Sequence, residues 1–372
     1  MLVFVGTYTE SILFGTGKVL EGKGEGIYAW RLDRSSGRLE LVGKTTGVTN
    51  PSYLAIDASG RFLYAVNELK TYEGQPTGTV SAFTLDPLTG ALRPLNTRRT
   101  HGTDPCHVIV DDARRHAFVA NFASGSVCVL PIRDDGSLDE ASDFVAHVGS
   151  GADPARQKGP HAHSVTLDSS TRFAFVPDLG LDKLMVYRFD AKRGMLEPHT
   201  VPWFKVRPGA GPRQLALHPG GRFAYLVNEL DSTVVALRYD EMAGTFEYLQ
   251  CVPALPAGFT GASTCADIQV HPSGRFLYAS NRGHDSIVIH RIDPATGVLD
   301  LVGHASTEGR TPRSFGIDPT GLFLLAANQD SDSIVTFRIG PDDGRLVPTG
   351  HVTYVPTPVC VKFSASKGAP MA

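Results

Sequence analysis

The stretch from Gly211 to Leu230, Gly-Pro-Arg-Gln-Leu-Ala-Leu-His-Pro-Gly-Gly-Arg-Phe-Ala-Tyr-Leu-Val-Asn-Glu-Leu, holds two short apolar runs joined by a Pro-Gly-Gly cluster. Alternation with aromatic and β-branched residues is typical of strands, and a Pro/Gly cluster is typical of a tight turn. The stretch therefore predicts a β-hairpin. Because the turn closes one end, we expect Arg213 and Glu229 to meet at the open end.

The same hairpin pattern occurs six times along the chain, which indicates a repeated structural unit. Each copy ends at an asparagine or aspartate, and an acid or histidine lies ten positions earlier in every case. The copies end at Asn67, Asn121, Asp178, Asn228, Asn281 and Asn328, and the earlier residues are Asp57, Asp111, Asp168, His218, His271 and Asp318. A third strand and a fourth strand that begins Gly-x-Leu or Gly-x-Phe follow each copy. Four antiparallel strands per repeat predict the blades of a propeller.

The two ends of the chain supply a further blade. Pro358–Phe363 resembles a first strand without a partner, and Leu2–Thr7 a second strand without one. Gly26–Leu32 and Gly37–Val42 match the third and fourth strands. Joining these segments closes the ring and leaves no free sheet edge.

We therefore predict an all-β fold, a seven-bladed β-propeller with four antiparallel strands per blade. The N-terminal and C-terminal strands share the closing blade, which is built from about residues 1–43 plus 357–366. Residues 1–372 are expected to form a single domain.

The net charge, the apolar runs and the cysteines of the chain limit which functions and partners we expect. The net charge of −3 gives no electrostatic reason to expect nucleic acid or an anionic membrane as partner. No apolar run is long enough for a membrane span, and the first residues lack a basic region and a cleavage site. The five cysteines are scattered without a CxxC pair, so we expect a reducing, cytoplasmic setting, no metal site and no cofactor. A closed ring is compatible with a monomer, and the oligomeric state is left open.

Long connections are expected at the rim where the first strands begin, which we call the mouth. They are Glu10–Glu25, Glu68–Gly78, Ser142–Pro160 and Cys251–Thr264. Long loops on a rigid scaffold are where binding residues concentrate. Two sets of repeat positions also face the mouth. The first column follows the proline position and contains Ser52, Cys106, His163, Arg213, Ala266, Arg313 and Val359; the second column follows the asparagine position and contains Glu68, Phe122, Leu179, Glu229, Arg282 and Gln329.

Both columns vary in charge while their neighbours stay constant, which points to function at these positions. We predict a catalytic set of His163, Arg213, Glu229 and Arg282, and a substrate-binding set of His161, Arg313 and Gln329. The asparagine column itself is expected to be structural, with side chains that bond to backbone at a turn. His161 and His163 have no carboxylate at ligand spacing, so they predict no metal site.

Four segments carry a resemblance to a known family: Gly159-Pro-His-Ala-His-Ser164, Gly211-Pro-Arg213, Val227-Asn-Glu-Leu230 and Ala279-Ser-Asn-Arg282. In order and blade spacing the chain resembles the seven-bladed propeller lactonase family. That family includes the cytoplasmic propeller-type 6-phosphogluconolactonase and the fungal carboxy-muconate lactonizing enzyme. The resemblance covers essentially the whole chain and implicates His163, Arg213, Glu229 and Arg282. A two-residue insertion around residues 160–163 leaves His161 and His163 as alternatives for the base.

Lactone hydrolysis requires a positioned water, a base and cations beside the developing oxyanion. His163 or Glu229 can act as the base. Arg213 and Arg282 can stabilise the oxyanion, or clamp a phosphate or carboxylate. The resemblance implies a lactonase for a small anionic lactone, 6-phosphogluconolactone or a related aldonolactone. Two alternatives stay open: a cofactor-free carboxy-cis,cis-muconate lactonizing enzyme (a cycloisomerase), and a non-catalytic propeller interaction module, which predicts an apolar mouth.

Overall fold

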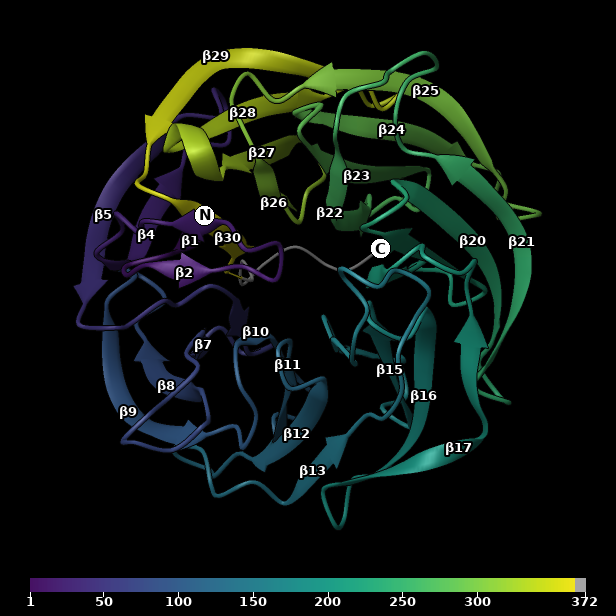
Figure 1. Cartoon of the computed structure of the whole chain (residues 1–372). Helices are drawn as coiled ribbons and strands as arrows, with labels where there is room; N and C mark the ends of the chain where they lie inside the picture. The colour runs from purple at the N-terminus through teal and green to yellow at the C-terminus, as the bar shows by residue number, and fades with distance from the viewer. Residues whose placement is uncertain (365–372) are drawn as a thin grey trace.

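A computed structural model describes residues 1–364. Seven four-stranded antiparallel sheets surround a central axis (Figure 1). The helical content of the described residues is one 3-10 turn, η1 (Gln329–Ser331). No helix among these residues has the length and apolar character needed to cross a membrane. The predicted seven-bladed propeller is confirmed.

Six blades are each built from four consecutive strands, with the first strand nearest the axis (Figure 1). The first three are β6 (Leu54–Ile56), β7 (Phe62–Asn67), β8 (Thr79–Leu85) and β9 (Leu92–Arg99); β10 (Pro105–Val110), β11 (His116–Asn121), β12 (Ser126–Pro131) and β13 (Asp143–Ala146); and β14 (Thr166–Leu167), β15 (Phe173–Asp178), β16 (Lys183–Asp190) and β17 (Met195–Lys205). The next three are β18 (Pro212–Leu217), β19 (Phe223–Asn228), β20 (Thr233–Asp240) and β21 (Thr245–Pro253); β22 (Thr264–Val270), β23 (Phe276–Arg282), β24 (Ser286–Ile292) and β25 (Leu299–Ser306); and β26 (Pro312–Ile317), β27 (Phe323–Asn328), β28 (Ser333–Ile339) and β29 (Leu346–Tyr354).

The closing blade joins both ends of the chain, as predicted. Its strand order is β30-β1-β4-β5, formed by β30 (Pro358–Phe363), β1 (Leu2–Thr7), β4 (Gly26–Leu32) and β5 (Leu39–Thr46). β1 pairs antiparallel with β30, so that Val5 lies opposite Val361. The fourth strand extends to Thr46, three residues beyond the expected bound at residue 43, and residues 365 and 366 of the predicted segment lie outside the described residues.

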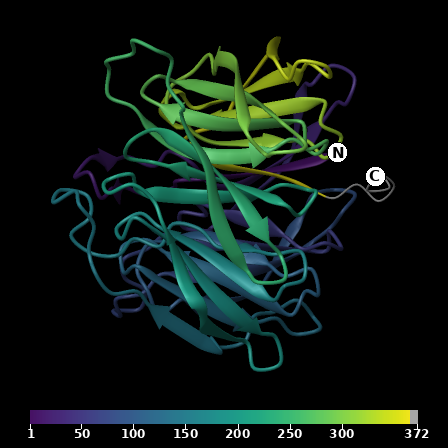
Figure 2. The same ribbon diagram turned by 90° about the vertical axis from the view of Figure 1, so that its right-hand side faces the viewer.

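Two predicted mouth connections contain strands. Residues 10–25 hold a small hairpin, β2 (Ile12–Leu13) and β3 (Val19–Leu20), on one face of the disc (Figure 2). The interpretation of residues 142–160 as connection alone was wrong, because β13 is the fourth strand of its blade. The Gly-x-Leu segment that precedes β13 forms only an isolated β-bridge, between Ile132 and Leu138, and no strand. The backbone of Leu138 is hydrogen-bonded instead to the side chain of Asn96 in the neighbouring blade.

Aromatic residues of the second strands hold adjacent blades together. Tyr225 and Tyr278 are buried, and each hydroxyl donates to the carbonyl of a turn glycine in the next blade, Gly297 and Gly344 respectively. Gly297 has a φ of +76° and lies against the Phe223 ring, where a Cβ would clash. The repeated aromatic pair and the repeated turn glycine therefore form one contact, which sets how neighbouring blades pack.

The asparagine column is structural, as expected. Asn67, Asn281 and Asn328 each donate from Nδ2 to a backbone carbonyl, at 2.8, 2.8 and 3.0 Å. Asp178 takes the place of asparagine in one blade, and its Oδ1 accepts hydrogen bonds from the backbone N–H groups of His161, Gly180 and Leu181. The three asparagine bonds tie the end of a second strand to the connection that leaves the preceding blade.

A chain ending at Pro356 is expected to lose the native fold. This chain lacks β30, so the edge of β1 that pairs with β30 would be left without a partner. We expect aggregation or a broad, non-cooperative thermal transition, measured by size-exclusion chromatography and circular dichroism. A chain ending at Ser364 keeps every strand described here and serves as the control. A monomeric, cooperatively melting product from the shorter chain would contradict the prediction.

Candidate active site

A cavity of about 180 Å³ opens at the mouth, around the axis. Both predicted columns contribute to its lining: Glu68, Phe122, Glu229, Arg282 and Gln329 from the second, and Cys106, His163 and Arg313 from the first. A smaller cavity lies next to it and shares Glu68, Cys106, His163 and Arg313; Ser52, Arg213 and Val359 also line it. Residues far apart in sequence therefore meet at one place, as the repeat predicted.

A β-bulge turns the first column toward the axis. The pairing of β18 with β19 shifts between Pro212 and Gln214, which leaves Arg213 as the extra residue. The same shift leaves out Cys106 in β10 and Arg313 in β26. A bulged residue is released from the ladder and its side chain is re-aimed. The residue after the proline therefore points away from the sheet faces that pack between blades.

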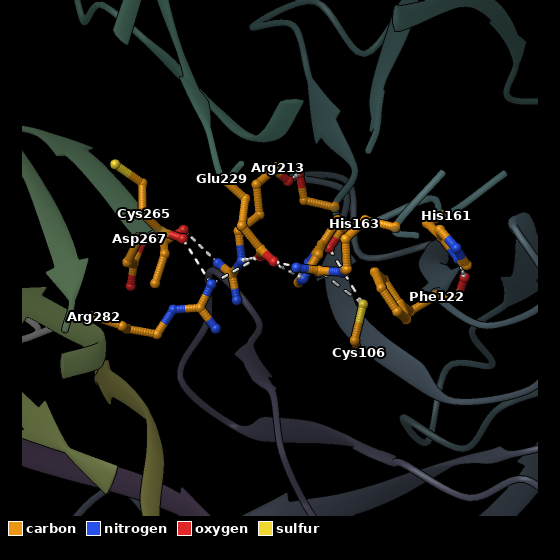
Figure 3. A network of polar contacts seen from close by, with 12 residues as sticks. Cys106, Phe122, His161, His163, Arg213, Glu229, Cys265, Asp267 and Arg282 are labelled. Atoms are coloured by element: carbon orange, nitrogen blue, oxygen red, sulfur yellow. Dashed lines mark hydrogen bonds and ion pairs between the residues drawn. The ribbon is translucent and has the colours of Figure 1, made fainter. Parts of the chain in front are cut away.

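Glu229 is the centre of the polar cluster (Figure 3). Its Oε2 lies 3.0 Å from Arg213 Nε and 2.9 Å from Arg282 Nη2, and its Oε1 lies 2.8 Å from Arg156 Nη2. His163 Nε2 lies 4.0 Å from the same Oε2. The predicted meeting of Arg213 and Glu229 at the open end of the hairpin is confirmed. The single carboxylate of Glu229 thus compensates part of the positive charge of three guanidinium groups.

The two arginines that share Oε2 are also held by backbone. Arg213 Nη1 donates to the Ala266 carbonyl, and Arg282 Nη2 donates to the Cys265 carbonyl at 2.8 Å. Arg282 Nε is buried and has no hydrogen-bond acceptor among residues 1–364. Gln329 Oε1 is also buried and has no donor in the same range. Both residues line the mouth cavity. Buried polar atoms without partners fit a site that binds a polar ligand.

Charge separates the roles that Glu229 and His163 can play. Burial alone would raise the pKa of Glu229, but Arg282 and Arg213 outweigh it and hold that pKa well below its usual range. Burial, followed by Arg213, lowers the pKa of His163 well below its usual value. At neutral pH the carboxylate is therefore ionised with a weak affinity for protons, and the imidazole is neutral with a free lone pair.

His161 is separate from this cluster. Its ring stacks on Phe122 with centroids 4.6 Å apart, and its Nδ1 lies 3.0 Å from the Phe122 carbonyl. Phe122 lies between the two histidines and contacts His163 edge-on at 5.2 Å (Figure 3). His161 is not among the residues that line the mouth cavity. Of the residues predicted for substrate binding, Arg313 and Gln329 line the cavity, whereas His161 supports its wall.

Sequence reasoning missed several lining residues. Arg156 comes from the long connection after β13, and Phe14 comes from the β2–β3 hairpin. Asp104 lies one residue before β10, and burial, followed by Glu68, raises its pKa to about 6. None of the three occupies a repeat position, so the pattern that selected the columns contains no signal for them. Within residues 1–364, no three His, Cys, Asp or Glu side chains are grouped as ligands of a metal ion.

The mouth cavity combines an imidazole, an ionised carboxylate and several guanidinium groups. A propeller with such a cavity belongs to the class of enzymes that act on small molecules. The family model described as "Lactonase, 7-bladed beta-propeller" matches residues 2–363. The chain therefore belongs to the seven-bladed propeller lactonase family.

Three relatives cover nearly all of the chain. It is 38% identical over 360 residues to a 6-phosphogluconolactonase of Bacillus subtilis, with 97% of each chain covered. A solved structure described as a periplasmic gluconolactonase of Pseudomonas aeruginosa is 35% identical, with a TM-score of 0.90 and 98% and 99% of the two chains covered. A putative 6-phosphogluconolactonase of Bacteroides fragilis is 36% identical, with a TM-score of 0.88 and 97% of each chain covered.

Proposed function

We propose that this protein is a lactonase that hydrolyses a sugar-acid lactone, 6-phosphogluconolactone or a related aldonolactone. One observation carries the proposal: His163, Arg213, Glu229 and Arg282 form one polar cluster at the mouth of a chain whose residues 2–363 match the lactonase family. The curated relative from B. subtilis, named for 6-phosphogluconolactone, supports the choice of substrate.

In the proposed reaction His163 is the general base. A neutral imidazole can take the proton of a water as that water attacks the lactone carbonyl. Glu229 is a poor base, because three guanidinium groups stabilise its ionised form. Its carboxylate instead orients the arginines and stabilises the imidazolium formed at His163.

The arginines stabilise the charge that develops on the carbonyl oxygen. Arg282 lines the cavity and its guanidinium carries five N–H donors, which suits an oxyanion contact. When the tetrahedral intermediate collapses, the bond between the carbonyl carbon and the ring oxygen breaks, and the proton held by His163 passes to that oxygen. The products are the open-chain hydroxy acid and a regenerated neutral imidazole.

The test is a rate panel over sugar-acid lactones, phosphorylated and not, each compared with its uncatalysed background. We expect 6-phosphogluconolactone or a related aldonolactone to be hydrolysed well above background. The panel includes carboxy-cis,cis-muconate, followed by its absorbance, because cyclisation of muconate is the alternative. Turnover of muconate without lactone hydrolysis would replace the proposal, and no turnover of any substrate would favour an interaction module.

The pH dependence tests His163 directly. Since the pKa of His163 is lowered, its base form persists below the ordinary histidine value of about 6.5. We expect kcat/KM to change little between pH about 7.5 and about 6.5, and to fall at more acidic pH. Because Asp104 has a pKa of about 6 and lines the same cavity, the profile is repeated with Asp104→Asn. Loss of half the activity at pH about 6.5 in both proteins would contradict the prediction.

We also place the protein in the cytoplasm. All five cysteines are free, and four of them are buried, which is typical of a reducing compartment. The P. aeruginosa structure described as periplasmic is the reason to test this by cell fractionation. Recovery with a periplasmic marker enzyme would overturn the assignment.

A further inference from the structure

Arg313 differs from the other guanidinium groups of the site. Arg156, Arg213 and Arg282 each form an ion pair with Glu229. Among residues 1–364, Arg313 has no ion pair within 4.0 Å and no side-chain hydrogen bond. Burial lowers its pKa, but Tyr8, Glu68 and Glu229 outweigh burial and raise it. Arg313 nevertheless lines both the mouth cavity and the smaller cavity beside it. Its N–H donors are therefore available to a ligand.

Two aromatic rings hold Arg313 in place. The guanidinium lies over Tyr8, 5.5 Å from the ring centroid, and over Phe14 at 5.1 Å. Tyr8 is itself fixed, since its hydroxyl donates to Glu68 Oε2 at 3.0 Å. Stacking uses the flat face of a guanidinium and leaves the five N–H donors at its edge. The side chain is thus oriented by contacts that do not use its hydrogen bonds.

Arg313 also reaches the cavity from a different blade than the proposed base. It belongs to the β26–β29 blade, and His163 precedes β14 in the β14–β17 blade, three blades away around a ring of seven (Figure 1). Three blades is the largest separation that such a ring allows. Both residues also line the smaller cavity, so one small ligand at the mouth can contact His163 and Arg313 from different sides.

We propose that Arg313 is a specificity-determining residue that binds the phosphate of a phosphorylated sugar-acid lactone. This inference rests on the proposed function and names the substrate class. In a lactone the carboxyl group is esterified, so a phosphate ester is the strong anion that remains. In a 6-phosphorylated six-carbon lactone, the phosphate is carried on C6, which lies outside the lactone ring, so it can meet a residue that does not contact the reacting carbonyl. Arginine binds phosphate through paired N–H donors.

The experiment compares kcat and KM for 6-phosphogluconolactone and for gluconolactone in wild type and in Arg313→Met. Methionine keeps an unbranched side chain between Tyr8 and Phe14 and removes the charge. We expect kcat/KM for the phosphorylated lactone to fall about 10- to 100-fold, mainly through KM. For gluconolactone, which carries no phosphate, we expect a loss about tenfold smaller. Arg313→Lys, which keeps the charge without the paired donors, should lie between the two.

Arg310→Met is the matched control, because Arg310 is exposed, lies outside the cavity lining and donates to the Asp330 carbonyl. It should leave the ratio of the two kcat/KM values unchanged. Equal losses on both lactones in Arg313→Met, with a native circular dichroism spectrum, would overturn the proposal, as would no loss on either. A wild-type protein that hydrolyses neither lactone would instead overturn the proposed function itself.

Discussion

Replacing His163 with glutamine is expected to lower kcat for lactone hydrolysis by about 10²–10⁴-fold, the usual contribution of a general base. Glutamine has a similar size and can form hydrogen bonds, but it cannot take a proton. His163 is 6% exposed and meets Cys106 Sγ at 3.7 Å and Glu229 at 4.0 Å, so a smaller residue would also disturb its packing. The measurements are initial rates at saturating substrate, and unfolding in urea to confirm that the variant is folded.

His161→Gln is the control for this variant, and it resolves the choice that the sequence left open. The His161 ring stacks on the far side of Phe122 and does not line the mouth cavity. We therefore expect its replacement to change kcat less than about threefold. If His161→Gln lost turnover while His163→Gln kept it, the assignment of the base would have to be reversed.

Replacing Glu229 with glutamine is expected to remove both activity and much of the stability. An ion pair that is buried and then loses one partner typically costs about 3–5 kcal/mol, because the remaining charge stays buried without compensation. Here one carboxylate serves three guanidinium groups, and Glu229 itself is 5% exposed. We expect the free energy of unfolding in urea to fall by about that amount at neutral pH.

The effect should depend on pH in a defined direction. The pKa of Glu229 is lowered in the folded protein, so its contribution to stability is present above the unfolded value of about 4.3 and is lost as pH falls through the folded pKa. The gap between wild type and Glu229→Gln should therefore persist from pH about 8 to about 5 and shrink below about 4. Glu40→Gln, which changes an exposed carboxylate on β5, should show no such gap. A difference below about 0.5 kcal/mol at neutral pH for Glu229→Gln would contradict the interpretation.

The hairpin repeat determined the architecture without any tertiary information. The strands that close the ring, Leu2–Thr7 and Pro358–Phe363, have in the structure the bounds that the sequence predicted. The contact between Arg213 and Glu229 was also predictable, because both belong to one hairpin and the turn position places them at the same end. The signals that predict the hairpin, alternation of apolar residues and turn-forming residues, lie within about twenty consecutive positions. A single sequence therefore contains all of them.

The composition of the site was decided only by the closed ring. Arg156, Asp104 and Phe14 lie outside the repeat, and they reach the cavity because distant blades bring their connections to one axis. The separation of His161 from His163 depends on Phe122, which comes from another blade. The ionised state of Glu229 and the neutral state of His163 follow from burial and from guanidinium groups of three different segments. Electrostatics of this kind depends on distances through space, which the order of residues does not contain.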